Sequence, residues 1–107
     1  MPDQQQMTDR AVWSKRANRF QSRWRAVGGR LHVADGQLRF DGHRIDHALG
    51  GRDWSTPLTD ISDVRVEGRR KLVEVELRDG TVERFVVRPA EAAAEELGNL
   101  ARSANGA

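Results

Sequence analysis

Two aspartates and two histidines lie close together in one polar segment: Asp41, His43, Asp46 and His47. In a helix, His43 and His47 would lie one turn apart on the same face, where their imidazoles could share a metal ion with His32. The spacing lacks the HExxH signature, and no neighbouring pattern supplies the partners that orient metal-bound histidines. We therefore interpret residues 42–53 as a solvated loop, and we expect no metal site and no cofactor.

Two serines, Ser55 and Ser62, could act as nucleophiles if a histidine and an aspartate lay beside them. Neither lies in a nucleophile elbow or beside a glycine-rich oxyanion loop. The pairs Gly28-Gly29 and Gly50-Gly51 are not followed by the Lys-Ser or Lys-Thr of a phosphate-binding loop. The sequence contains no cysteine, which excludes thiolate nucleophiles, cysteine-ligated metals and disulfides. We therefore predict that the protein is not an enzyme.

Basic residues are concentrated near the start of the chain. Residues 1–30 contain seven basic residues and two aspartates, a net charge of +5, whereas residues 31–107 carry a net charge of −3. Such an excess favours an anionic partner, although arginines on a solvated strand face can also serve solubility alone. A second basic run lies at a predicted turn. The candidate anion-binding or partner-binding residues are Arg19, Arg23, Arg25, Arg69, Arg70 and Lys71.

Length and composition indicate one small domain. A chain of 107 residues with 37% hydrophobic and 32% charged residues has room for a single small core. Residues 1–9 are polar and lack the apolar segment of a signal peptide. No apolar run approaches the roughly 20 residues of a membrane span. We therefore expect a cytoplasmic protein, either free or bound peripherally at the inner membrane face.

Alternation of apolar and polar residues predicts a series of short antiparallel strands. The two best-defined hairpins have the turns Asp35-Gly36 and Asp79-Gly80, because Asp-Gly favours the positive φ angles of a type I′ turn. In a regular strand, Val82 would point to the opposite face from Phe85 and Val87. This indicates either a bulge or burial of both strand faces. The predicted strands are residues 30–33, 37–41, 54–58, 61–66, 73–77 and 82–87.

The segment before the first Asp-Gly hairpin is harder to assign. Residues 11–20 fit either a helical stripe or a strand. From Phe20 to Ala26 a period of two predicts a strand with Phe20 and Trp24 inward and the intervening arginines outward. Gly28-Gly29 is expected to break or bulge the chain. If Trp24 belongs to the core, Trp24→Ala should destabilise the fold by about 3–5 kcal/mol.

A C-terminal helix is predicted from Pro89 to Arg102, because proline suits a first helical position and alanines and leucines form a narrow apolar stripe. We expect residues 1–10 to be a disordered leader, residues 11–102 a single domain and residues 103–107 a disordered tail. A meander of about seven strands covers its faces and edges by curling into a barrel or sandwich capped by the helix. The predicted fold class is therefore mostly β.

Three sequence elements carry a family resemblance. Gly29–Ala34 with Leu38–Phe40 is similar to the pattern GxLxLTxxRLxF, and Trp54–Ile61 is similar to IPLxDI. Leu77–Val87 is similar to LxDGxxxxF. In order and spacing these elements resemble the pleckstrin-homology-like (PH-like) superfamily, in particular its GRAM and bacterial PH branches, over about two thirds of the chain.

The resemblance implies a non-catalytic interaction module, with no catalytic residues to transfer. In eukaryotic relatives a ring of basic residues after the first hairpin strand binds inositol phosphates. This sequence shows no such ring, so the resemblance does not imply phosphoinositide binding by this protein. The leading expectation is a protein partner, docked on an exposed strand edge or between the helix and an edge strand. The alternative is an anionic surface, either phospholipid headgroups or, less favoured, nucleic acid.

Overall fold

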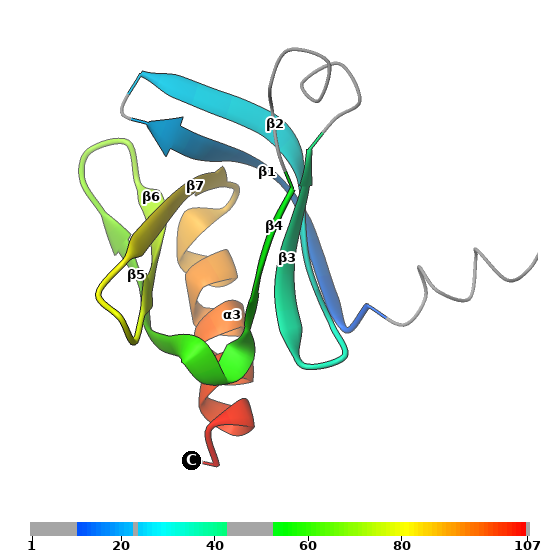
Figure 1. Ribbon diagram of the computed structural model, residues 1–107. Coiled ribbons are helices and arrows are strands. Elements are labelled where there is room, and N and C mark those ends of the chain that lie inside the picture. The colour runs from blue at the N-terminus through cyan, green and yellow to red at the C-terminus, as the bar shows by residue number, and fades with distance from the viewer. Residues whose placement is uncertain (1–10, 23, 43–52, 107) are drawn as a thin grey trace, which may run out of the picture.

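The computed structural model describes residues 11–22, 24–42 and 53–106 (Figure 1). The predicted leader and most of the loop that contains His43 and His47 lie outside the described residues. The elements in chain order are β1 (Trp13–Ser22), β2 (Arg25–Ala34), β3 (Gln37–Gly42), β4 (Trp54–Pro57), the 3-10 turn η1 (Leu58–Asp60), β5 (Ile61–Glu67), β6 (Leu72–Leu77), β7 (Val82–Val87) and α3 (Ala90–Ala104).

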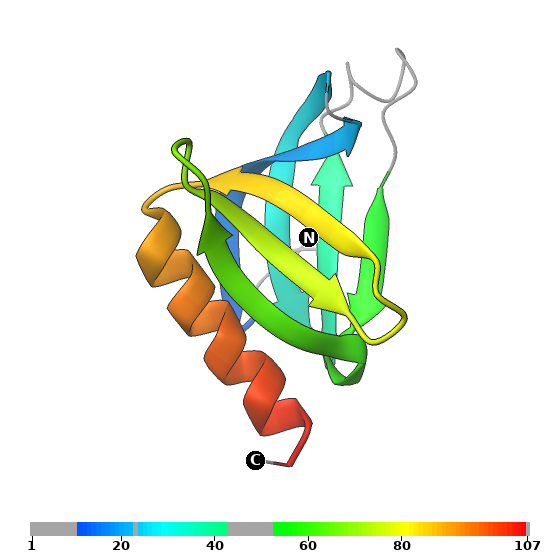
Figure 2. The same cartoon turned by 90° about the vertical axis from the view of Figure 1, so that its left-hand side faces the viewer.

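The seven described strands form one antiparallel sheet that curls around a common core. Its order is β4-β3-β2-β1-β7-β6-β5, so β1 joins the two halves of the meander and the edges are β4 and β5. Figure 2 shows α3 running along β5, and it also packs on η1, which links the two edge strands. The structure therefore confirms the predicted mostly β fold with a C-terminal capping helix.

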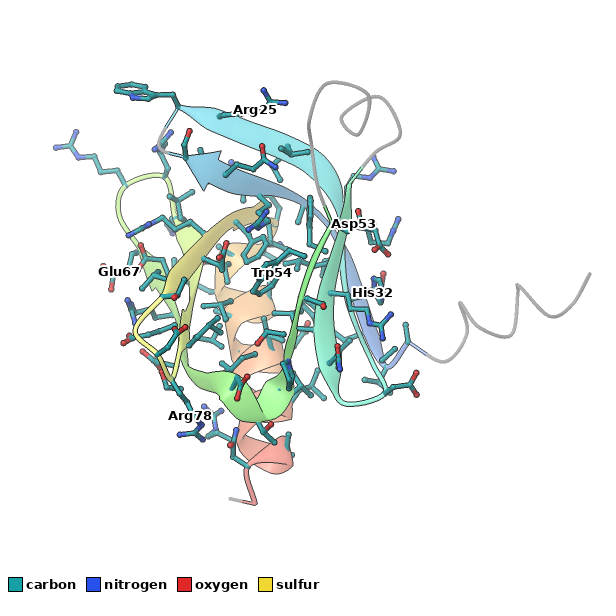
Figure 3. All side chains as sticks on the ribbon, viewed as in Figure 1. Arg25, His32, Asp53, Trp54, Glu67 and Arg78 are labelled. Carbon is teal, nitrogen blue, oxygen red and sulfur yellow. The ribbon has the colours of Figure 1, made fainter. Side chains whose placement is uncertain are left out.

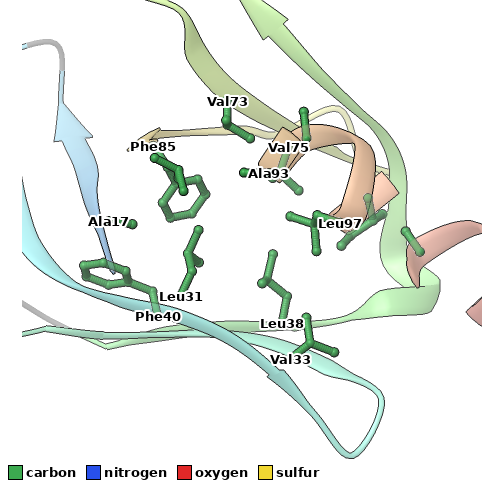
Figure 4. Close-up of a cluster of buried hydrophobic side chains, with 14 of the residues drawn as sticks. Ala17, Leu31, Val33, Leu38, Phe40, Val73, Val75, Phe85, Ala93 and Leu97 are labelled. Atoms are coloured by element: carbon green, nitrogen blue, oxygen red, sulfur yellow. The ribbon is translucent and has the colours of Figure 1, made fainter. Parts of the chain in front are cut away.

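The core contains the inward-facing side chains of both halves of the sheet and one face of α3 (Figure 4). Leu31, Leu38, Phe40, Phe85 and Leu97 are completely buried. The ring of Phe85 lies 6.1 Å from that of Phe40, centroid to centroid, in a tilted arrangement. Burial of these side chains is the main stabilising contribution in a domain of this size.

Both Asp-Gly hairpins form, but only the first has the predicted turn type. Asp35 and Gly36 have φ angles of 55° and 75°, which are those of a type I′ turn. In the second hairpin Gly80 has a φ of 92° but Asp79 has no positive φ, so this turn is not of type I′. The main-chain N–H of Thr81 donates to Oδ1 of Asp79 at 2.9 Å. The register between β6 and β7 contains no bulge, so Val82 lies on the outer face of the sheet, where it is half-buried.

The strand predicted from Phe20 to Ala26 is wrong. β1 runs from Trp13 to Ser22, which resolves the ambiguous residues 11–20 largely as strand, and the chain then turns back into β2. Trp24 lies in this turn and is 86% exposed. The alternation of Phe20 and Trp24 therefore spans a hairpin turn instead of one face of a strand.

Gly28-Gly29 continues β2 instead of breaking it, and the two residues pair with Asn18 and Ala17. Glycine is required at position 29 because β2 packs closely against β3 there. A Cβ atom there would lie 2.2 Å from the carbonyl oxygen of Asp41 and 2.8 Å from Cζ of Phe40. Only glycine allows the chain to approach β3 so closely at this point.

The helix α3 begins at Ala90, directly after Pro89, and ends at Ala104. It starts one residue later and ends two residues later than predicted, so Ser103 and Ala104 belong to the helix and not to a tail. Asn105 completes the helix end, because its Nδ2 donates to the carbonyl oxygen of Ala101 at 2.8 Å. No helix within the described residues is long and apolar enough to cross a membrane.

Candidate binding surface at two hairpin tips

The β1–β2 and β5–β6 turns lie at the same end of the molecule, the upper end in Figures 1 and 2. A contact joins them: the guanidinium carbon of Arg70 lies 5.5 Å from the ring centroid of Phe20. Around these turns the structure exposes one large aromatic ring and four basic side chains. We call this set the hairpin-tip surface; its residues are Trp24, Arg25, Arg69, Arg70 and Lys71.

Trp24 is the most exposed large hydrophobic residue of the described chain, at 86%. The main-chain N–H of Trp24 donates to Oγ of Ser22 at 3.3 Å, a contact within the turn. Arg25 follows directly at the start of β2 and is labelled at the upper end of that strand in Figure 3. At this exposure the ring buries little apolar surface and contributes little to the core.

The β5–β6 turn holds its three basic residues outside the barrel. Gly68 has a φ of 80° and Lys71 a φ of 55°, and the N–H of Lys71 donates to the carbonyl oxygen of Gly68 at 3.1 Å. This tight turn leaves all three side chains exposed. Nζ of Lys71 lies 2.9 Å from Oε2 of Glu91, and this lysine lowers the pKa of the Glu91 carboxyl.

Arg19 is not part of the hairpin-tip surface. Its side chain is only 14% exposed, and its Nη2 lies 3.1 Å from Oε1 of Glu83. The guanidinium also lies 5.5 Å from the ring centroid of Trp54, which in turn contacts Phe85 at 5.8 Å between centroids. Arg23 lies outside the described residues. The structure thus brings together four of the six predicted residues: Arg25, Arg69, Arg70 and Lys71.

The outer face of β5, β6 and β7 pairs two arginines with four carboxylates in one network. Glu74, with its side chain 12% exposed, accepts from Nε of Arg84 at 2.9 Å and from Nε of Arg65 at 3.2 Å. Arg65 also donates to Glu76 and Asp63, and these hydrogen bonds raise its pKa above the ordinary value. Because this face pairs its charges, the excess of positive charge on this half of the sheet lies at the tips.

The surface has two larger concave regions, one beside the tips and one near the C-terminal end of α3. A cleft of about 580 Å³ opens between the end of β1 and the start of β7, with Arg70 and Leu72 from the β5–β6 hairpin also lining it. A groove of about 340 Å³ lies between α3 and the edge strand β5. Its lining includes Ile61, Val64 and Ala101.

The residues considered for catalysis or metal binding are not assembled into a site within the described ranges. Nδ1 of His32 lies 3.5 Å from Oδ2 of Asp41, and no described group of three or more histidine or acidic residues could hold a metal ion. Oγ of Ser62 donates to the carbonyl oxygen of Glu76 at 3.1 Å, which leaves it bound to the main chain and not to a histidine. His43 and His47 lie outside the described residues.

Sequence reasoning identified the basic residues of the tips but placed Trp24 in the core. The sequence gives no turn signal at Trp24, because the stretch from Phe20 to Ala26 contains no glycine or proline and alternates like a strand. Phe20 was also assigned to the inner face. In the structure its ring lies under Arg70 and lines the cleft between β1 and β7.

No known protein-family profile matches the sequence, and no curated protein sequence is similar enough to match. The fold, in contrast, has many solved counterparts. The C-terminal domain of an unknown protein from Leishmania infantum superposes with a TM-score of 0.71 at 12% identity, over 94% of each chain. The N-terminal PH domain of human ARAP2 gives 0.60 at 15% identity, covering 87% of this chain and 77% of that one.

A linker-DH/PH structure of p115-RhoGEF gives a TM-score of 0.67 at 13% identity. The match covers 91% of this chain and 29% of that one, so this chain corresponds to less than a third of the p115-RhoGEF structure. Two of these three structures contain PH domains. The protein therefore has a PH-like fold, as the sequence resemblance implied.

Proposed function

We propose that the protein is a non-catalytic PH-like binding module, of the GRAM or bacterial PH type, that docks on an anionic phospholipid surface through the hairpin-tip surface. In this proposal it works in the cytoplasm and binds peripherally at the inner membrane face. The observation that carries the proposal is the 86% exposure of Trp24 beside basic residues on two adjacent turns.

The residue types fit a membrane interface. Tryptophan prefers the boundary between headgroups and acyl chains, because its ring is apolar and its N–H is polar. Each lysine or arginine near an anionic leaflet contributes about 1 kcal/mol of attraction. Four basic residues at the tips, partly offset by Glu91, therefore supply enough attraction for reversible binding, and the indole adds a contact below the headgroups.

The structure also offers a surface for the protein partner that the sequence first suggested. β5 is an edge strand, and the groove of about 340 Å³ beside it is lined by both β5 and α3. An extended or helical segment could bind there. We rank this second, because the groove lacks an exposed aromatic anchor of the kind that Trp24 gives the tips.

Vesicle flotation tests the proposal. The full chain should float with vesicles of phosphatidylcholine and phosphatidylserine at low salt, but not with phosphatidylcholine alone. Trp24→Ala and the double variant Arg69→Glu/Arg70→Glu should each lose most of this binding. Arg16→Glu/Arg39→Glu is the matched control, because it makes the same change in net charge at exposed strand positions away from the tips.

Salt separates an anionic surface from an edge-strand partner. Binding through phosphate contacts should fall steeply between low and physiological salt, because released counterions and screening both oppose it. A chain that does not float at low salt, or floats equally well when all tip residues are changed, would rule out the membrane proposal. The groove between α3 and β5 would then be the leading candidate.

A further inference from the structure

The pairing between β1 and β7 stops before either strand ends. It covers three residue pairs, Ala17↔Val87, Asn18↔Val86 and Arg19↔Phe85. β1 nevertheless continues to Ser22, and β7 begins at Val82. Among the described strands, residues 20–22 pair only with β2 and residues 82–84 only with β6. Two short main-chain edges therefore diverge from the point at which the ladder ends.

The space between these edges is the cleft of about 580 Å³. Residues 19–22 line one wall and residues 82–84 the other, while Arg70 and Leu72 line it from the β5–β6 hairpin. Figure 2 shows the end of β1 rising away from β7 on this side of the molecule. The cleft thus combines bare strand edges with partly buried apolar side chains of Phe20, Leu72 and Val82.

We propose that this cleft binds an extended acidic segment of a partner protein, which adds as a short strand beside β1 or β7. Main-chain hydrogen bonds to residues 20–22 or 82–84 would supply the pairing that the sheet itself leaves unmade. The apolar walls would accept alternate side chains of the segment, since side chains of a strand alternate between its two faces.

Charge complementarity selects an acidic occupant. The cleft is lined by three arginines, Arg19, Arg70 and Arg84, and by one carboxylate, Glu83. Arg19 is bound to Glu83 and Arg84 to Glu74, whereas Arg70 contacts the face of Phe20 and forms no ion pair with the described residues. A carboxylate of the bound segment could pair with Arg70 without breaking either internal ion pair.

This site overlaps the proposed membrane contact at one residue only. The two share Arg70, but Trp24, Arg25 and Arg69 belong to the hairpin-tip surface and do not line the cleft. Arg69→Glu and Arg70→Glu therefore form a matched pair of variants. Both should weaken vesicle binding, but only Arg70→Glu should weaken peptide binding.

The test uses a phage-displayed library of random linear peptides, selected on the full chain. The best peptide is then synthesised with a fluorescent label, and its affinity is measured by anisotropy. We expect selected peptides to be acidic, with apolar residues at alternate positions. In a ¹⁵N-labelled chain the peptide should shift the amide resonances of residues 20–22 and 82–84. Arg70→Glu should weaken binding about tenfold, and Arg69→Glu should stay within about twofold.

Methylation of the peptide tests strand addition without altering the protein. Two forms of the peptide carry N-methyl groups on alternate residues, one on the odd and one on the even positions. One form should bind about tenfold more weakly, because it loses the donors that face the protein edge, and the other should bind normally.

Several results would overturn the proposal. These are a failure to select any peptide, shifts confined to the groove between α3 and β5, or equal binding of both methylated forms. Shifts of the same amides by glycerophosphoserine but by no peptide would identify a headgroup as the occupant instead. Self-association abolished by Arg70→Glu would identify a second copy of the chain.

Discussion

Trp24 and Phe85 are both large aromatic residues, but the structure gives them opposite environments. Trp24 is 86% exposed in the β1–β2 turn, whereas Phe85 is fully buried between Phe40 and Trp54. At the residue scale, the exposed fraction of a side chain distinguishes residues that stabilise the fold from residues that are accessible to a partner. Loss of a buried ring removes apolar burial and leaves a cavity, and loss of an exposed ring does neither.

We therefore predict that Trp24→Ala changes the free energy of unfolding by less than about 0.5 kcal/mol, whereas Phe85→Ala lowers it by about 3–5 kcal/mol. Urea denaturation followed by circular dichroism measures both. Equal losses for the two variants would mean that Trp24 packs against the core. That was the expectation from sequence alternation.

Two glycines should respond to alanine in opposite directions. Gly29→Ala places a Cβ 2.2 Å from the carbonyl oxygen of Asp41, so β2 and β3 would have to separate, and we expect a loss of about 1–3 kcal/mol. Gly98 lies inside α3, where a Cβ would meet only the flexible end of Arg102 at 3.4 Å. Gly98→Ala should therefore stabilise the protein by about 0.5–1 kcal/mol. Thermal melting of both variants checks the signs, and a neutral Gly29→Ala would contradict the close approach.

At the scale of single elements, the β6–β7 turn links stability to pH. The N–H of Thr81 donates to Oδ1 of Asp79, and this hydrogen bond lowers the pKa of the Asp79 carboxyl. Because the pKa is lower in the folded chain than in the unfolded chain, the stabilisation is present at neutral pH. It is lost at acid pH, as the pH falls below the ordinary pKa of an aspartate and through the lower folded value.

We predict that Asp79→Asn makes stability less dependent on pH in this range. The amide keeps an oxygen acceptor for Thr81 but has no proton to gain. Melting temperatures measured from pH 5 downward should fall less steeply for the variant than for the original chain. Parallel curves would show that this carboxylate does not contribute to acid unfolding.

The elements differ in how well the sequence predicts them, and turn chemistry explains why. The two Asp-Gly hairpins are predicted correctly in position, because Asp and Gly both favour turns, but only Asp35-Gly36 has the two consecutive positive φ angles of the predicted type I′ turn. The β1–β2 turn contains Trp24 between arginines and no glycine, so the alternation of Phe20 and Trp24 suggests one continuous strand. From the neighbouring residues alone, Gly29 suggests a break in the strand. Glycine is required there because the chain packs closely against β3, a strand that is distant in sequence.

The candidate site follows the same division. The basic residues of the β5–β6 turn could be identified from sequence, because three consecutive cations after a glycine indicate an exposed turn. The proximity of these residues to the β1–β2 turn could not be predicted from sequence. It depends on how β1 joins β7 and on the contact between Arg70 and Phe20. The cleft is also a property of the tertiary structure alone, because it opens where the β1–β7 pairing stops.

At the scale of the whole molecule, the distribution of charge matters more than its sum. The chain carries a net charge of only +2. The outer face of β5–β7 pairs its charges through Glu74, while one end of the barrel combines four basic residues with an exposed indole. The opposite end contains the C-terminus of α3 and the η1 turn (Figure 1). This polarity gives the barrel one end suited to an anionic surface.

The most direct test of this account is the fluorescence of Trp24 itself. The chain has three tryptophans, so the emission of Trp24 is obtained by subtracting the spectrum of Trp24→Phe from that of the original chain. With vesicles containing phosphatidylserine at low salt, we predict that this emission moves to shorter wavelength, because the indole leaves water, and that added salt reverses the shift. A difference spectrum that stays unchanged while the chain binds the vesicles would contradict the claim that Trp24 and the hairpin-tip surface form the contact.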